Sequence, residues 1–588
     1  MADHDTPSMD STGTTNHGWR SRLYSQVPLR SRNGTIRLLT IEPRSHKSDR
    51  PEGKDVVQCF LKLEDLKTQH SGFAAVSHAC EAEGEGNVMV NGALVPVSDD
   101  IVALLQSLQH DHDAVTIWID ALCINYADVE EKSAQLAQIP RIFSAASSTV
   151  IWLGQAAAGS DGAMDALNRL DEEHLTPAAQ KLLLAALRKT PWILRTANGE
   201  AHSDHSAKEE SLEDQLDGLR SSFTELMNRQ YWSRLWSLPE LVFTKKGSVM
   251  CGSRSLDLHR FHAAAKALDG VLNMATYSKW LEASKTTTAS TTALDNTEPA
   301  NFSASPSILL LTERDHFVGS RGWWSSTEHP LLSILIRYHL NQAETRLRSK
   351  FDDQRDLIFG FVGLSSDADS LGISIDYQKE WTQLCVETTI SFLQHNPKVW
   401  QLCLGHSRAD PETPSWLVDW RRIVLPASYD SGRSFHACGP ADVRFYRPDA
   451  QNNKTITTKG VILDLIGDVV SVESSHTNFT EEIKKALDET FKRSLDMAGT
   501  PYAKDQEPNV PTSMLKDSCF ITETGYIGCS EKLAKGDVVV ILYGCEVPFA
   551  LRKQTDNMYR LLGEVYVEGI MEGEFMKVHR LESSIRIG

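Results

Sequence analysis

One stretch constrains the fold of this chain more than any other, namely the apolar run that leads into Asp120. Residues 116–119 are Thr-Ile-Trp-Ile, which is typical of a strand buried on both faces. Polar side chains that directly follow such a strand lie at the carboxyl edge of an α/β sheet, where ligands bind. Asp120 and Asn125 occupy that place. Asp and Asn also turn the chain routinely, and on this pattern alone the turn interpretation is the better one.

Strand and helix patterns alternate around this run. Residues 73–77 and 149–154 have the composition of buried strands, and residues 98–108 and 128–143 have helical periodicity. Pro140 is expected to kink or end the second of these helices, because it removes the backbone bond to Leu136. An Asn91-Gly92 pair between β-formers predicts a type I′ hairpin. Because strand, helix and strand in this order imply a right-handed crossover, we expect an α/β domain with a parallel sheet.

Changes in composition along the chain predict its domain organisation. The first residues are rich in Ser, Thr, Asp and Gly and bury too little apolar surface to fold, whereas the last part has short strands separated by Gly turns. The expected parts are a disordered tail at 1–21, an α/β domain at 22–260 with an insertion at about 156–222, a mainly helical region at 261–440 with a Ser/Thr-rich linker at 284–307, and a β-rich domain at 441–588.

Charge and composition exclude several classes of protein. A net charge of −18, from 60 basic and 78 acidic residues, argues against sequence-independent nucleic-acid binding, which requires a basic surface. No apolar run is long enough to cross a bilayer, and the N-terminus is not a signal peptide, so a cytoplasmic protein is expected.

Common catalytic and metal-binding motifs are missing from the sequence. Its 10 cysteines have none of the spacings of a zinc site, which favours buried, reduced thiols. The His-Asp stretches at 110–113 and 202–205 lack a third ligand and are expected to be solvated loops, so no metal site is predicted. There is no P-loop, no G-x-S-x-G elbow and no H-E-x-x-H motif.

Several separated motifs of the chain together form one pattern. The most specific is the run Ile117-Trp118-Ile119-Asp120-Ala121-Leu122-Cys123-Ile124-Asn125. The other matching residues are Ala74 to Ser77, Asn91-Gly92, Glu131-Lys132 with Gln135, Val150 to Gly154, Trp232 to Trp236 with Glu240, Arg355-Asp356, Gly363-Leu364, Asp376-Tyr377, Lys459 to Val461, Gly525 to Gly528, Gly536-Asp537 and Gly569 to Glu574. In these motifs the chain resembles one family, the fungal heterokaryon-incompatibility (HET) domain proteins, and the similarity covers nearly the whole chain after the tail.

The resemblance implies a role in non-self recognition between fungal cells that ends in growth arrest or regulated cell death. It also implies protein partners, either an allelic or a non-allelic incompatibility factor, and self-assembly. The family's HET domain looks like a relative of the Toll/interleukin-receptor (TIR) fold, a parallel sheet flanked by helices. Some TIR relatives hydrolyse NAD with a glutamate that lies one helical turn after a tryptophan, and Trp236 and Glu240 have that spacing.

The resemblance therefore suggests a candidate site. Cleavage of an N-ribosyl bond develops positive charge on the sugar, so a well-placed carboxylate favours the transition state. In this hypothesis NAD is a candidate substrate, no resident cofactor is expected, Glu240 is the catalytic carboxylate and Trp236 is a stacking wall. The side chains that would line the carboxyl edge of the sheet are Ser77, Asp120 and Asn125.

A structural interpretation of Glu240 competes with the catalytic one. Residues Ser237-Leu238-Pro239-Glu240 have the pattern of a capping box, in which the glutamate bonds back to the first amide of its own helix. A helix that begins at Ser237 would leave Trp236 outside it. Since proline is much better tolerated in a first turn than in a helix interior, the sequence favours this capping interpretation.

The chain also departs from the family at four positions near the candidate site. Its His78 and Cys80 stand where the family usually has Tyr and Trp, and Tyr126 and Pro239 each stand where it usually has Gln. A second hypothesis follows, in which the chain is a non-catalytic interaction or regulatory module with a degenerate pocket. A third hypothesis is that the chain acts in a gene cluster or a developmental pathway unrelated to incompatibility, because a fold constrains function only loosely.

Overall fold

The computed structural model of the chain forms two compact units. Unit 1 comprises the residues up to Ser366 together with Ser374–Gln378, and unit 2 comprises Asp367–Ile373 and Lys379–Gly588. The structure describes residues 18–29, 34–44, 56–67, 72–80, 84–157, 159–169, 212–270, 272, 305–318, 329–345, 353–395, 413–421, 428, 435–439, 445–446, 454–473, 479–503, 507–554, 558–578 and 581–588.

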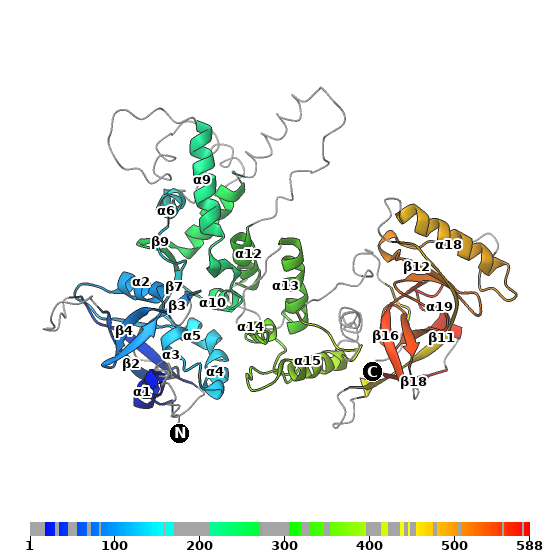
Figure 1. The fold of residues 1–588 in the computed structure, drawn as a ribbon, viewed down its shortest axis with the longest axis horizontal. Helices are drawn as coiled ribbons and strands as arrows, with labels where there is room; N and C mark the ends of the chain where they lie inside the picture. The colour runs from blue at the N-terminus through cyan, green and yellow to red at the C-terminus, as the bar shows by residue number, and fades with distance from the viewer. Residues whose placement is uncertain are drawn as a thin grey trace, which may run out of the picture. The chain divides into compact units, whose positions relative to one another are not determined.

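Unit 1 is built on a nine-stranded sheet with the strand order β5-β4-β2-β1-β6-β3-β7-β8-β9 (Figure 1). Its strands are β1 (Thr35–Ile41), β2 (Gln58–Asp65), β3 (Ala74–His78), β4 (Gly86–Val90), β5 (Ala93–Val97), β6 (Val115–Trp118), β7 (Ser148–Trp152), β8 (Gly247–Cys251) and β9 (Arg254–Asp257). Strands β6, β3, β7 and β8 form a parallel block. The remaining pairs are antiparallel except β2 with β4.

The predicted α/β class is confirmed, but the prediction of a parallel sheet is wrong for half of this sheet. Strand β6 contains the apolar run of the sequence and lies inside the sheet, parallel to β3 on one side and antiparallel to β1 on the other. Strands β4 and β5 pair antiparallel because Asn91 (φ 51°) and Gly92 (φ 77°) form the predicted tight turn between them. Local hairpins thus extend a parallel centre into a mixed sheet.

Unit 1 also contains helices and a 3-10 turn. They are α1 (Gly18–Gln26), α2 (Asp99–Leu108), α3 (Asp120–Cys123), α4 (Val129–Leu136), α5 (Ile139–Ala145), α6 (Ser160–Arg169), α9 (Leu212–Met227), the 3-10 turn η2 (Gln230–Ser233), α10 (Ser237–Val242), α12 (Pro306–Val318), α13 (Leu331–Thr345) and α14 (Asp356–Val362). The helical pattern over 128–143 is interrupted at Pro140 as predicted and forms the pair α4 and α5, with Pro140 in the first turn of α5, where its missing N–H costs nothing.

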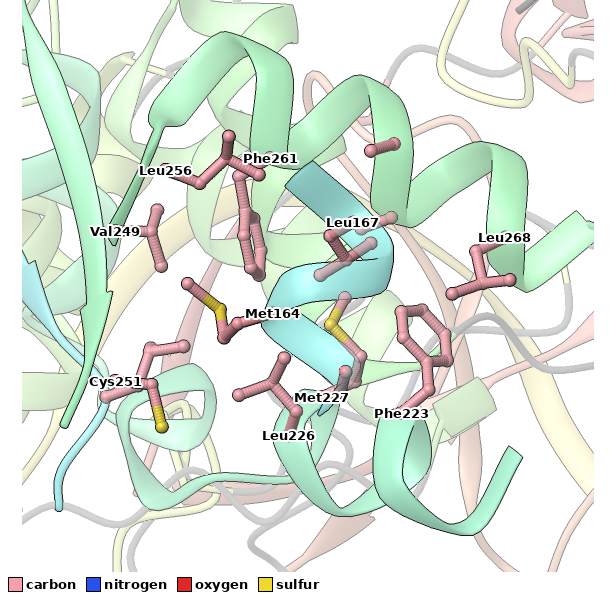
Figure 2. Packing of buried hydrophobic residues seen from close by; sticks show 14 of the residues in the cluster. Met164, Leu167, Phe223, Leu226, Met227, Val249, Cys251, Leu256, Phe261 and Leu268 are labelled. Carbon is pink, nitrogen blue, oxygen red and sulfur yellow. The ribbon is translucent and has the colours of Figure 1, made fainter. Parts of the chain in front are cut away.

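The predicted insertion at about 156–222 contributes to a hydrophobic core that it shares with later segments of the chain. Helix α6 contacts α9, β8 and β9, and the buried side chains of this core include Met164, Phe223 and Val249 (Figure 2). Helix α1 begins at Gly18, inside the stretch predicted as a tail. Residues 1–17, 170–211 and most of the linker at 284–307 lie outside the described residues.

Unit 2 is β-rich, as the sequence predicts. Its elements are α15 (Trp381–His395), β10 (Phe445–Tyr446), β11 (Ile456–Ser471), α18 (Phe479–Leu495), η4 (Thr512–Met514), β12 (Ser518–Thr522), β13 (Ile527–Ser530), β14 (Val538–Leu542), β15 (Phe549–Lys553), β16 (Met558–Glu564), β17 (Tyr566–Val567), α19 (Glu574–Val578) and β18 (Ser583–Ile587). Strand β11 pairs with both β14 and β18, and β14, β15, β16 and β18 pair in succession, so these five strands close into a barrel. The C-terminal end of β11 pairs with β12, β12 pairs with β13, and β13 pairs with β17.

Candidate functional site

A cluster of buried polar side chains lies where β3 and β6 end. Ser77 and His78 are the last two residues of β3, and Asp120 begins α3 just after β6. Glu240 approaches from α10, which is far away in the sequence. Because β3 and β6 are parallel neighbours, their carboxyl ends meet at one edge, as the sequence analysis expected.

The carboxylate of Glu240 is fully engaged inside the protein. Its Oε2 atom accepts a hydrogen bond of 2.5 Å from the Ser77 hydroxyl, and its Oε1 atom accepts one of 2.8 Å from Nη1 of Arg234. The Ser77 hydroxyl also lies 2.8 Å from the hydroxyl of Tyr231, which donates to it when Ser77 donates to the carboxylate. The Glu240 side chain is only 3% exposed, so it does not face open solvent.

Arg234 joins the two carboxylates of the cluster. Its Nη2 atom lies 3.2 Å from Oδ2 of Asp120, while Nη1 bonds Glu240. Asp120 also accepts from the Tyr126 hydroxyl at 3.1 Å, and its Oδ1 lies 2.6 Å from Nε2 of His78. The guanidinium therefore bridges two acids that would otherwise repel each other in a buried place.

These contacts shift the pKa values of the acids in opposite directions. Burial disfavours the charge of Asp120, but the nearby His78 and Arg234 outweigh it and hold the pKa of Asp120 well below its usual range. Burial raises the pKa of Glu240, and the neighbouring charge of Asp120 adds to that rise, against the opposing effect of Arg234. As the pH falls, Glu240 therefore takes up a proton before Asp120 does.

His78 is held by contacts at both ring nitrogens. Burial lowers the pKa of His78, but the Asp120 carboxylate outweighs this effect and raises that pKa to about 10. The backbone amide of Cys80 lies 3.0 Å from Nδ1, where it donates to a ring lone pair and so favours the neutral Nε2–H form. We therefore assign the proton between His78 and Asp120 to Nε2, which donates to the carboxylate, and expect the amide to limit the rise in the pKa.

The capping-box interpretation of Glu240 is wrong. Helix α10 has no side-chain cap, and the Ser237 hydroxyl instead donates to the carbonyl of Tyr231 at 2.9 Å. The carboxylate of Glu240 points to Ser77 and Arg234, and the Arg234 guanidinium adds an ion pair to its hydrogen bond, which a neutral backbone amide cannot. The local pattern is present in the sequence, but tertiary partners override it.

Two of the predicted site residues lie outside this cluster. Trp236 has helical dihedral angles, but its side chain forms a hydrogen bond with Asp356 instead of joining the cluster. Burial raises the pKa of Asp356, and the bond from Trp236 opposes that rise. The amide of Asn125 donates to Glu131 at 2.7 Å, and its side-chain oxygen has no hydrogen-bond partner among the described residues. The structure therefore brings together Ser77, Asp120 and Glu240, but not Trp236 or Asn125.

Sequence reasoning did not assign site roles to His78, Tyr126, Tyr231 or Arg234, which complete the cluster. One signal was available for Arg234. It and Glu240 are the only charged residues in the apolar stretch 231–243, and they have opposite signs. Opposite charges in an otherwise buried segment indicate an internal ion pair.

A second buried ion pair holds the turn after β6. The Arg37 guanidinium bonds both oxygens of Glu131, at 2.5 and 3.0 Å, and its side chain is 1% exposed. Arg37 also donates to the carbonyl of Cys123 at 3.1 Å. Glu131, one of the residues that match the HET pattern, therefore holds the segment from Cys123 to Asn125 in place and does not contact Glu240.

The motifs around Asp356 and Tyr377 also meet in unit 1. The Tyr377 hydroxyl bonds Asp356, and the Tyr377 amide donates to the Ser133 hydroxyl of α4 at 2.9 Å. The Lys132 ammonium lies 3.7 Å from the centre of the Tyr377 ring. These contacts tie the segment that follows α14 to α4.

A cavity of about 440 Å³ lies at the ends of β7 and β8, lined in part by Trp152, Met250 and Arg44. None of the residues that bond Glu240 or Asp120 lines it. Within the described ranges, no three His, Cys, Asp or Glu side chains are arranged to hold a metal ion, and no helix is long and apolar enough to span a membrane. The stretch 110–113 forms exposed bends, whereas 202–205 lies outside the described residues.

Comparison with known proteins adds independent findings. Residues 73–240 match the family model described as "Heterokaryon incompatibility protein (HET)", and residues 473–584 match the one described as "Het-6 beta-barrel domain". The chain is 22% identical over 678 residues to "Heterokaryon incompatibility protein 6, OR allele" of Neurospora crassa, an alignment that covers 94% of this chain and 96% of that protein. No solved structure matches the chain. The barrel match begins after β11, although β11 is the strand that closes the barrel.

Proposed function

We propose that this chain belongs to the heterokaryon incompatibility protein family and acts in non-self recognition between fungal cells, with growth arrest or regulated cell death as the outcome. The observation that carries the proposal is the alignment with the Neurospora crassa protein over nearly the full length of both chains. The HET match and the barrel match, at opposite ends of the alignment, support it. The proposed place of action is the cytoplasm, and the proposed partners are protein products of an allelic or non-allelic incompatibility locus, together with further copies of the chain.

A transformation assay tests this role. The full chain would be introduced into a panel of genetically distinct fungal isolates, and the growth of the transformants would be scored against an empty vector. We expect growth arrest in some isolates and normal growth in others, because a recognition protein responds to particular partners. Normal growth in every isolate, or equal arrest in all of them, would argue against non-self recognition.

NAD hydrolysis is the second candidate, and one observation favours it. Ser77, Asp120 and Glu240 gather at the carboxyl edge of a parallel block of strands, which is where α/β and TIR-like domains bind ligands. In this proposal the block of β6, β3, β7 and β8 is the TIR-like part of the sheet. Glu240 would hold the ribose hydroxyls and stabilise the positive charge that develops as the N-ribosyl bond breaks.

Burial of the cluster favours a non-catalytic role instead. Both oxygens of Glu240 already accept hydrogen bonds from within the protein, and the carboxylate is 3% exposed. A substrate would have to displace Ser77 or Arg234 to reach it. In the non-catalytic proposal the cluster fixes α10 against the ends of β3 and β6, and the HET domain acts through protein contacts.

Release of nicotinamide separates these two candidates. Purified full-length protein would be incubated with NAD, both in dilute solution and after clustering with a bivalent antibody against a terminal tag. Catalysis predicts release that is lost in Glu240→Gln and kept in Asp165→Asn, a matched change at an exposed ion pair of the same unit. If neither dilute nor clustered protein releases nicotinamide, while the same protein still causes growth arrest in cells, the non-catalytic role is supported.

A further inference from the structure

Two cysteines of unit 2 face each other across neighbouring strands. Cys519 of β12 and Cys529 of β13 are direct partners in the antiparallel register, and their sulfur atoms lie 3.5 Å apart. Both are buried, with exposures of 0% and 1%. Neither thiol belongs to the candidate site of unit 1, and nothing in the proposed function uses them.

The register places this pair where a disulfide fits. The amide of Thr522 donates to the carbonyl of Tyr526 at 2.8 Å, so 522 and 526 form a hydrogen-bonded pair of this hairpin. Because hydrogen-bonded and non-hydrogen-bonded pairs alternate, Cys519 and Cys529 form a non-hydrogen-bonded pair. Such pairs have Cα atoms about 4.5 Å apart, within the range that disulfides span, and the sulfurs need only close to about 2.05 Å.

Helix α18 covers the two thiols. It lies alongside β12 in Figure 1, and its buried side chains Ile483 and Leu487 share a hydrophobic core with Cys519 and Cys529. The Cys519 sulfur lies 3.7 Å from the carbonyl oxygen of Ile483. Hydrogen bonding with Cys519, together with burial, raises the pKa of Cys529 well above its usual range. Since the thiolate is the reactive form, this pair is slow to react while α18 is in place.

We propose that Cys519 and Cys529 are a modification site, oxidised by hydroperoxide to a disulfide that links β12 to β13. One thiolate attacks a peroxide oxygen, which breaks the O–O bond and yields a sulfenic acid and water. The second thiolate then attacks the sulfenic sulfur, forms the S–S bond and releases a second water. In sum, two thiols give up two hydrogens and hydrogen peroxide is reduced to two molecules of water, so atoms and electrons balance.

The position of α18 controls the rate of this reaction. Opening of α18 exposes the pair, allows the thiols to ionise and admits the oxidant. Once formed, the disulfide covalently fixes the register of β12 and β13 and so keeps these two strands paired. The presence of the disulfide would therefore show that α18 had moved away from these strands while peroxide was present.

The test uses the full-length protein and hydrogen peroxide as the oxidant. After timed exposure, free thiols are blocked and the protein is digested without reduction, and mass spectrometry then follows the peptide that links Cys519 to Cys529. The half-buried Cys80 serves as an internal control for peroxide activity, since it is outside this pair and more accessible. We expect the linked peptide in the wild-type protein and in Cys438→Ser, and its loss in Cys519→Ser.

A variant of α18 tests the gating. Leu487→Ala removes a buried contact of α18 and is expected to speed disulfide formation roughly tenfold or more, because large-to-small changes weaken the local packing of a core. The proposal is overturned if Cys80 is oxidised while Cys519 and Cys529 stay as free thiols in both proteins. It is equally overturned if the two become sulfinic acids or pair with other cysteines. An unchanged rate in Leu487→Ala would refute the role of α18.

Discussion

Replacement of Arg234 by methionine tests the central feature of the candidate site, the guanidinium between two buried acids. The change keeps much of the length and apolar volume of the side chain, but removes the hydrogen bonds of 2.8 Å to Glu240 and 3.2 Å to Asp120. Removing one partner from a buried ion pair costs about 3–5 kcal/mol. Because the Arg234 side chain is 21% exposed, we expect a value near the lower end, about 3 kcal/mol.

The pH dependence of this loss has a definite sign. Without Arg234 the pKa of Glu240, which is already raised, rises further, so the folded protein binds a proton that the unfolded chain releases. Stability then falls as the pH rises above the ordinary range of a glutamate. Arg234→Met should therefore lose more stability at pH 8 than at pH 5.

Hydrogen exchange followed by mass spectrometry measures the effect in the full-length chain. A loss of about 3 kcal/mol corresponds to exchange on the order of a hundredfold faster in peptides of β3, β6 and α10. Arg254→Met is the matched control, because Arg254 pairs with Asp165 at an exposed place where its side chain is 47% exposed. Loss of that surface pair should change exchange by less than about 1 kcal/mol.

A double variant identifies the cause of the loss. Glu240→Gln in the Arg234→Met background removes the carboxylate charge that has lost its ion-pair partner, so part of the stability should return, with a coupling of at least about 1 kcal/mol. The reasoning is refuted if Arg234→Met exchanges like the wild type at pH 8. It is also refuted if the effects of Arg234→Met and Glu240→Gln simply add.

Three further predictions concern other parts of the fold. Arg37→Met should destabilise unit 1 by about 3–5 kcal/mol in chemical denaturation, because it leaves the buried Glu131 carboxylate unpaired; unchanged stability would contradict this. His78→Asn should remove a fall in stability that begins near pH 6.5 and ends below about pH 10, since a raised pKa stabilises the fold below the unfolded value, this is lost as the pH rises, and the Cys80 amide limits the rise; parallel pH curves would count against it. Gly528→Ala should lower the stability of unit 2 by more than about 2 kcal/mol in thermal melts, because the added Cβ would lie 2.1 Å from a backbone oxygen of β17. Gly467→Ala is the control: its Cβ would lie 3.4 Å from the nearest atom, so the stability should stay within about 1 kcal/mol of the wild type.

Local features of the fold could be predicted because their causes are local. The strand around Trp118 is buried as its composition indicates, and Asn91-Gly92 turns the chain because both residues tolerate positive φ. The break between α4 and α5 likewise follows from the chemistry of Pro140. Each of these predictions depends only on residues within a few positions of one another.

Pairings between distant segments could not be predicted in the same way. Nothing in the composition of β1 indicates that it runs antiparallel to β6, since an apolar strand can pair in either direction. Both the strand-helix-strand order and the resemblance predicted a parallel sheet, and only the block of β6, β3, β7 and β8 and the pair β2 with β4 follow it. The barrel raises the same difficulty, because β11 pairs with β14 and β18 over long separations in the sequence.

The partner of Glu240 illustrates why the site was harder to predict than the fold. The four residues that begin at Ser237 satisfy a capping pattern, and the sequence offers no local reason to reject it. The glutamate instead bonds Ser77, which is 163 positions away. A carboxylate in a buried place takes the strongest donors within reach, and these are set by the sheet and not by its own helix.

The departures from the family pattern acquire a different meaning in the structure. Viewed along the sequence, His78 and Tyr126 replace residues that the family usually has, which suggested a lost pocket. In the fold both of these side chains bond Asp120, and Arg234 completes its set of partners. A ligand that reached Asp120 would have to break a charge-assisted hydrogen bond worth about 1.5–3 kcal/mol for each partner displaced. Catalysis at this edge would therefore need a rearrangement driven by binding or assembly, whereas a structural role needs none, which is why clustered protein is the decisive state in which to look for NAD turnover.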